Sequence, residues 1–99
     1  MDKKDKIIGI IDDFLESYKR TTVYLYDGKS TSTAVNEANN LTTLFKSDVE
    51  TILSKDSSYD KITSIRNLSK IYAKCLQKLN PFTVVDVQGF ANVMEKEMR

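Results

Sequence analysis

Apolar side chains recur at intervals of three and four residues through most of this 99-residue chain. That spacing is typical of one face of an α-helix. With one proline and three glycines, little in the chain interrupts long helices. The pattern predicts four helices, over about Lys4–Tyr24, Ser32–Ser54, Tyr59–Leu79 and Val84–Met98. Short connections between such helices favour an all-α, antiparallel four-helix bundle with up-down-up-down order, with residues 1–99 as one domain.

Each predicted helix has an apolar stripe that we expect to face the core. Along the chain, the four stripes consist of Ile7, Ile11, Phe14, Leu15, Tyr18 and Leu25; Val35, Ala38, Leu41, Phe45, Val49, Ile52 and Leu53; Ile62, Ile65, Leu68, Tyr72, Cys75, Leu76 and Leu79; and Val84, Val87, Phe90, Ala91, Met94 and Met98. Ile71 lies at the margin of the third stripe.

The end of the first helix is ambiguous. The segment Thr21–Tyr26 is rich in β-branched and aromatic residues, and Asp27-Gly28 follows it. This combination is also typical of a strand and a hairpin turn. We favour the helix, because the apolar period continues through Leu25 and because Lys29–Thr33 lacks the large apolar residues of a partner strand. Gly28 would then end the helix in the left-handed conformation.

Other polar residues indicate helix boundaries. A Ser or Thr within Ser30–Thr33 is the expected N-cap of the second helix. Asn80-Pro81 ends the third helix, because a residue before proline is pushed out of the helical region. Thr83 is the expected N-cap of the fourth helix, with Asp86 as the acidic partner three residues later.

The composition excludes several classes of function. The chain has no histidine and only one cysteine, so Ser-His-Asp or Cys-His sites, Cys/His zinc sites and an internal disulfide are excluded. The glycines form no phosphate-binding loop. We therefore expect no catalytic residues, no metal and no cofactor. There is no apolar run long enough to span a membrane and no pattern of a secretory signal, which predicts a cytoplasmic protein.

A row of basic residues is the strongest functional signal. Arg66, Lys70, Lys74 and Lys78 recur every fourth residue, and no Asp or Glu occurs from Lys61 through Val85. The row covers about a third of the third helix's circumference, roughly opposite the apolar stripe. We therefore predict these four residues as a partner-binding stripe for an anionic surface. The alternative is a solvated helix face, or one neutralised by acidic side chains from a neighbouring helix.

Other features carry weaker signals. The formal net charge is only +1, and no aromatic residues are interleaved with the basic ones for base stacking, so nucleic acid is a poor candidate partner. Cys75 lies on an apolar stripe and is expected to be a buried structural thiol. Asp12, Asp13 and Glu16 form an acidic patch that is expected to be solvated or to pair with basic groups on another helix.

The C-terminal part of the chain resembles a known family. A basic amphipathic helix leads into Leu79-Asn80-Pro81-Phe82-Thr83, and Gln88 lies in the next helix. In this pattern and in size, the chain resembles the bacteriocin immunity proteins of lactic acid bacteria and streptococci. The resemblance covers the region from about Asp60 to Arg99. It implies a cytosolic four-helix bundle without catalytic residues, which protects a producer cell from its own pore-forming peptide.

The resemblance also implies a protein partner, in particular a membrane-embedded receptor contacted from the cytosolic side, with peripheral membrane contact. In that family, the C-terminal half is associated with choosing which bacteriocin is countered. Two alternatives stay open. One is a small phage- or plasmid-type regulator that binds nucleic acid. The other is a structural or secretion-accessory helical module, whose apolar faces complete a partner or a homodimer.

Overall fold

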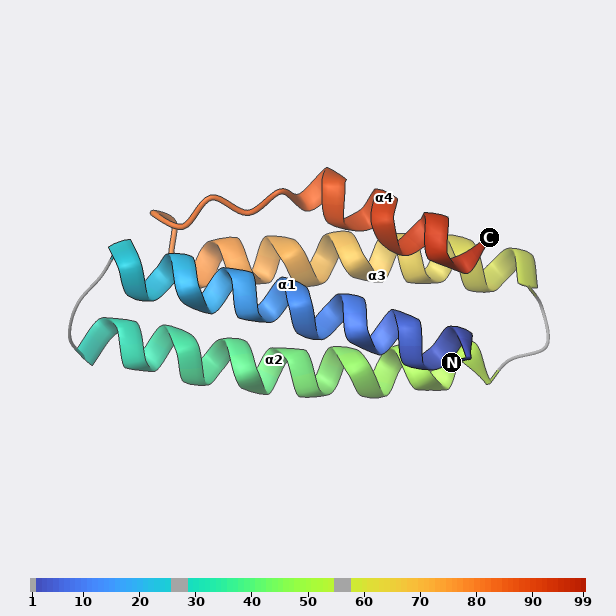
Figure 1. The fold of residues 1–99 in the computed structure, drawn as a ribbon, viewed down its shortest axis with the longest axis horizontal. Helices are drawn as coiled ribbons and strands as arrows, with labels where there is room; N and C mark the ends of the chain where they lie inside the picture. The colour runs from blue at the N-terminus through green and yellow to red at the C-terminus, as the bar shows by residue number, and fades with distance from the viewer. Residues whose placement is uncertain (1, 26–28, 55–57) are drawn as a thin grey trace.

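The computed structural model describes residues 2–25, 29–54 and 58–99, and all regular structure in these ranges is helical. Four helices are present: α1 (Lys3–Leu25), α2 (Lys29–Leu53), α3 (Ser58–Leu79) and α4 (Val87–Met98). They form an elongated bundle of 45 × 21 × 20 Å (Figure 1). Each helix packs on the next along the chain, and α4 packs on α1, so the helices surround a common core. The all-α prediction is confirmed.

The ends of α1, α2 and α3 lie toward the two ends of the long axis, whereas α4 begins near the middle (Figure 1). In Figure 1, the end of α1 lies beside the start of α2, and the end of α2 lies near the start of α3 at the opposite end of the bundle. The Nζ atom of Lys3 donates a hydrogen bond to the Met98 carbonyl at 2.9 Å, which joins the first turn of α1 to the last turn of α4.

Four aromatic rings, one from each helix, meet in the core. Phe14 of α1 stacks on Phe90 of α4 with ring centroids 4.0 Å apart. Phe45 of α2 stacks on Tyr72 of α3 with centroids 4.3 Å apart. Tilted contacts between Tyr72 and Phe90, at 5.9 Å, join the two stacks. The tilted spacing lies within the range of favourable aromatic pairs, about 4.5–7 Å, and the two stacked spacings lie just below it. All four rings lie on the stripes predicted from the apolar period.

Hydroxyl groups inside the bundle are bonded across helices. The Tyr18 hydroxyl donates to the Leu76 carbonyl at 2.9 Å. The Tyr72 hydroxyl bonds to Thr42 Oγ1, and the Thr42 hydroxyl lies 2.7 Å from the Ala38 carbonyl. Because a buried polar group without a partner is costly, these bonds favour one alignment of α1, α2 and α3 over neighbouring ones.

The predicted start of α4 is wrong. The helix begins at Val87, three residues after the predicted Val84, and its N-cap is Asp86. The Asp86 carboxylate accepts a hydrogen bond from the Gly89 amide at 2.8 Å. A Cβ atom on Gly89 would collide with that carboxylate, so glycine leaves room for the cap. Val84, predicted to face inward, is 87% exposed.

Two side chains explain the late start of α4. The hydroxyl of Thr83, the predicted N-cap, is buried and hydrogen-bonded to Thr22 of α1 at 3.0 Å. The side chain of Gln77 on α3 accepts from the Val85 amide at 2.8 Å and donates to the Pro81 carbonyl at 3.1 Å. Both groups hold residues 80–86 in an irregular connection, because their bonds compete with those of a first helical turn.

The remaining predicted boundaries have mixed outcomes. Thr21–Leu25 is helical rather than extended, while Tyr26 and the predicted stop at Gly28 lie outside the described residues. The N-cap predicted within Ser30–Thr33 is wrong, because α2 begins at Lys29 and includes all four residues. Local preference for a cap is small enough to be overridden by the rest of a long helix. The predicted end of α3 at Leu79, before Asn80-Pro81, is confirmed.

The cap on α4 gives a test of its boundary. Replacing Asp86 with Ala removes the acceptor for the Gly89 amide and is expected to lower the free energy of unfolding by about 1 kcal/mol. Asp86→Asn keeps an acceptor oxygen and should change it by only a few tenths of a kcal/mol. Urea unfolding followed by circular dichroism measures both. Equal losses in the two variants would show that the cap does not stabilise the helix.

Burial of Tyr72 predicts a stability change at high pH. Burial raises the pKa of Tyr72 to about 12, an effect that the hydrogen bond from Thr42 partly offsets. In the unfolded chain, the Tyr72 hydroxyl ionises near pH 10. The stabilisation from its buried, neutral form is therefore complete below pH 10 and is lost as pH rises from 10 to 12. Over that interval, the free energy of unfolding of the wild type should fall by roughly 2–3 kcal/mol more than that of Tyr72→Phe. Urea unfolding at each pH measures the difference, and parallel profiles would contradict the assignment.

Candidate functional site

The predicted basic row lies along the outer side of α3. Lys74 and Lys78 are exposed, whereas Arg66 and Lys70 are half-buried. The difference follows from the row's drift around the helix, which brings Arg66 against α4 and carries Lys74 and Lys78 away from it. The four residues therefore do not form one equivalent set.

Arg66 is bound to α4. Its guanidinium donates to the Asn92 side-chain oxygen at 2.8 Å and lies 3.6 Å from a carboxylate oxygen of Glu95. The Arg66 and Glu95 side chains are only 21% and 29% exposed. Arg66, predicted as part of the partner-binding stripe, is therefore held against α4 and not freely exposed. The alternative, neutralisation by an acidic side chain of a neighbouring helix, is confirmed for this residue.

The rest of the row keeps its charge uncompensated. Among the side chains that the structure describes, those of residues 2–22, 32–54 and 61–99, no ion pair involves Lys70, Lys74 or Lys78. Three positive charges thus remain on one side of α3, spaced by one helical turn each. They form the part of the predicted stripe that can meet an anionic partner.

The acidic patch on α1 is partly neutralised. Asp12 forms an ion pair with Lys46 of α2, and Glu16 lies 3.1 Å from Lys19 on the same helix. The predicted pairing with another helix is therefore confirmed for Asp12. Asp13 is exposed. In the described part of the chain, no three Cys, Asp or Glu side chains lie close enough together to hold a metal ion.

Sequence reasoning missed an apolar groove between α2 and α3. It has a volume of about 120 Å³ and is lined by Leu41, Leu44, Phe45, Asp48, Leu68, Ile71, Tyr72 and Cys75. Leu44 is 65% exposed and Ile71 is 58% exposed. Cys75, predicted to be buried, is only partly so because it faces this groove. The signal available in sequence was weak, since Leu44 lies outside the predicted stripe and Ile71 at its margin.

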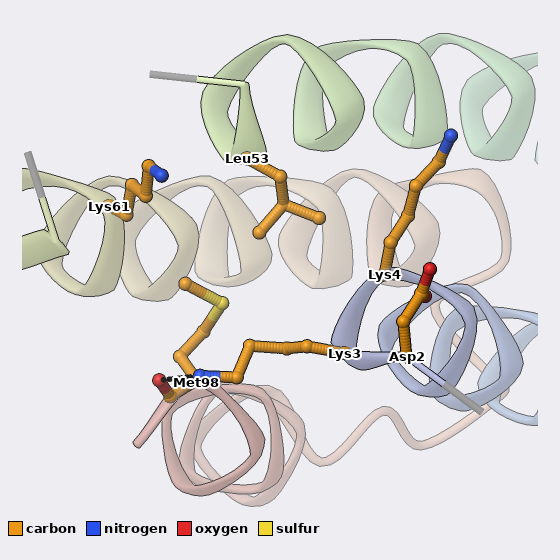
Figure 2. Close-up of a pocket in the computed structure, with 6 residues that line it drawn as sticks. All are labelled: Asp2, Lys3, Lys4, Leu53, Lys61 and Met98. Atoms are coloured by element: carbon orange, nitrogen blue, oxygen red, sulfur yellow. Dashed lines mark hydrogen bonds between the residues drawn. The ribbon is translucent and has the colours of Figure 1, made fainter. Parts of the chain in front are cut away.

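A larger hollow lies where the two chain ends meet. Its volume is about 320 Å³, and it is lined by Asp2, Lys3, Lys4, Leu53, Lys61 and Met98. Figure 2 shows the ammonium groups of Lys3, Lys4 and Lys61 pointing in different directions, with Lys3 directed at the Met98 carbonyl. Lys4 also lies 3.9 Å from Glu50. Ligand sites have polar groups that converge on one point, and these three lysines do not.

None of the described helices contains an apolar stretch long enough to cross a lipid bilayer. No protein-family profile, curated protein or solved structure matches this chain. The function therefore has to be inferred from the residues and their geometry.

The unequal roles of the basic residues can be tested by stability. Arg66→Ala removes bonds to Asn92 and Glu95 at a partly buried site, and is expected to lower the free energy of unfolding by about 1 kcal/mol. Lys74→Ala, on the exposed side of the same helix, should change it by less than about 0.5 kcal/mol. Urea unfolding of the two variants provides the comparison. Equal effects would mean that the contacts of Arg66 with α4 do not stabilise the bundle.

Proposed function

We propose that this chain is a non-enzymatic binding protein of the bacteriocin-immunity type, which protects a producer cell by binding a protein target at the cytosolic side of the membrane. The observation that carries the proposal is the set of three uncompensated lysines, Lys70, Lys74 and Lys78, on the outer side of α3. The likeness of the C-terminal pattern to that family, from the basic helix through Asn80-Pro81, supports the same function.

We also infer the antiparallel up-down-up-down order that this family implies. The hydrogen bond between Lys3 and the Met98 carbonyl supports it, because it places the start of α1 beside the end of α4. The bond between Thr22 and Thr83 supports it at the other end, where α1 finishes and the connection after α3 begins. Helices that alternate in direction and are joined by short connections are the simplest arrangement that allows both hydrogen bonds.

The proposed contact face combines the lysines of α3 with α4. Arg66 acts indirectly, because its bonds to Asn92 and Glu95 hold α4 against α3. A face that carries positive charges suits an acidic protein surface.

Nucleic acid is a weaker candidate partner. The pairing of Arg66 with Glu95 removes one charge from the row, and the whole chain carries a formal net charge of only +1. Proteins that bind phosphate backbones depend on a dense set of unpaired basic groups.

Protection of living cells tests the proposal. The chain is expressed in a sensitive lactic acid bacterium, which is then challenged with a panel of pore-forming bacteriocin peptides. The wild type should raise survival against at least one peptide. Reversing Lys70, Lys74 and Lys78 to Glu should abolish that protection while the protein remains folded, because the three side chains make no ion pair within the described residues.

A matched control separates position from charge. Lys4, Lys6 and Arg20 are exposed residues of α1, and reversing all three to Glu changes the net charge by the same amount. This control should keep protection. Protection lost equally in both triple variants would refute the proposed face, and no protection against any peptide by the wild type would refute the immunity function.

A further inference from the structure

The α2–α3 groove has an apolar floor that the bundle leaves uncovered. Leu44 on α2 and Ile71 on α3 are mostly exposed, and Leu41, Leu68 and Cys75 line the hollow between them. Large apolar side chains that gather on one exposed surface typically mark an interaction site.

The two walls of this groove carry opposite charges. On α2, the exposed residues Glu37 and Asp48 share the helix face of Leu44, at spacings of seven and four residues. On α3, Lys74 and Lys78 follow Ile71 at spacings of three and seven residues. In the described part of the chain, no ion pair involves any of these four charges. The groove is thus acidic along α2, basic along α3 and apolar between.

One pair of these charges, Glu37 and Lys78, also lies at a matching level along the groove. The stacking of Phe45 on Tyr72 defines a common level for the two helices. Figure 1 shows α2 and α3 progressing in opposite directions along the long axis. From the stacked pair, Glu37 lies about 12 Å along α2 and Lys78 about 9 Å along α3, toward the same end. These two residues therefore face each other across the open side of the groove.

We propose that this groove binds a second copy of the chain, about a two-fold axis that runs parallel to α2 and α3. Such an axis places α2 of one copy over α3 of its partner, because a two-fold interface exchanges the same surface between copies. The acidic wall then meets a basic wall on both sides of the axis. The apolar floors, with Leu44 and Ile71, cover each other in the centre.

Other occupants match this surface less well. An anionic lipid surface, or an acidic amphipathic helix, would be attracted by Lys74 and Lys78 but repelled by Glu37 and Asp48. A second copy is complementary to both walls. The inference goes beyond the proposed function, since it requires no target. The dimer covers Lys74 and Lys78, which the protective face shares, and leaves Lys70 and α4 uncovered on the other flank of α3.

Sedimentation equilibrium of the full chain tests the dimer, at concentrations from about 10 µM to about 1 mM, the range in which weak complexes dissociate. The wild type should show a reversible monomer–dimer equilibrium. Ile71→Glu should weaken dimerisation at least tenfold, because it places a charge at the apolar centre. Lys70→Glu, on the α4 side of the same helix, is the matched control and should change it less than about twofold. Circular dichroism checks that each variant is folded.

A charge exchange tests the two-fold geometry. Glu37→Lys and Lys78→Glu, made singly, place like charges opposite each other twice in each dimer, and each should weaken dimerisation about tenfold. The double variant restores opposite charges and should return the dissociation constant to within about threefold of the wild-type value. Failure of the double variant to recover would overturn the proposed pairing of the walls.

Cys75 reports on the same surface independently. It is the only cysteine of the chain and lines the groove, so dimerisation should slow its alkylation by iodoacetamide as protein concentration rises. A wild type that stays monomeric at the highest concentration overturns the proposal. A monomer that co-sediments with phosphatidylglycerol vesicles, and loses this binding in Ile71→Glu, would assign the groove to a lipid surface instead.

Discussion

The central aromatic layer is the contact on which the alignment of the four helices depends. Phe14, Phe45, Tyr72 and Phe90 come from four different helices, yet their rings form two stacked pairs in tilted contact with each other. Sliding one helix by a turn, about 5.4 Å, would separate its ring from the others and leave a void. The Tyr72 hydroxyl, bonded to Thr42, adds a polar requirement to the same alignment.

That alignment decides which charges are neutralised. With Phe90 held in the layer, α4 places Asn92 and Glu95 against Arg66. α4 comprises residues 87–98 only, because the residues before it form the irregular connection that Gln77 and Thr83 hold in place. Lys74 and Lys78, farther along α3, therefore have no acidic side chain of α4 opposite them among the described residues. One basic residue of the row supports the bundle, and the others are left for contacts outside it.

The same arrangement leaves two distinct flanks on α3. One flank holds Lys70 and α4, which are part of the face that we associate with protection of a producer cell. The other flank opens onto the α2–α3 groove, where the apolar floor lies between an acidic and a basic wall. A dimer formed through the groove would present two copies of the first face, and paired sites bind a clustered or membrane-embedded target more tightly than single ones.

The sequence by itself determined the number of helices, most of the inward stripes and the end of α3, because helical periodicity and a residue before proline act locally. It also located the basic row. Only the tertiary structure decided the start of α4, since Thr83 prefers a cap in isolation but is bonded to Thr22, far away in the chain. Likewise, only the packing separated Arg66 from Lys74 and Lys78 and left Leu44 and Ile71 uncovered. Such features depend on which helices become neighbours and at what level, and a periodic pattern within one helix carries no information about either.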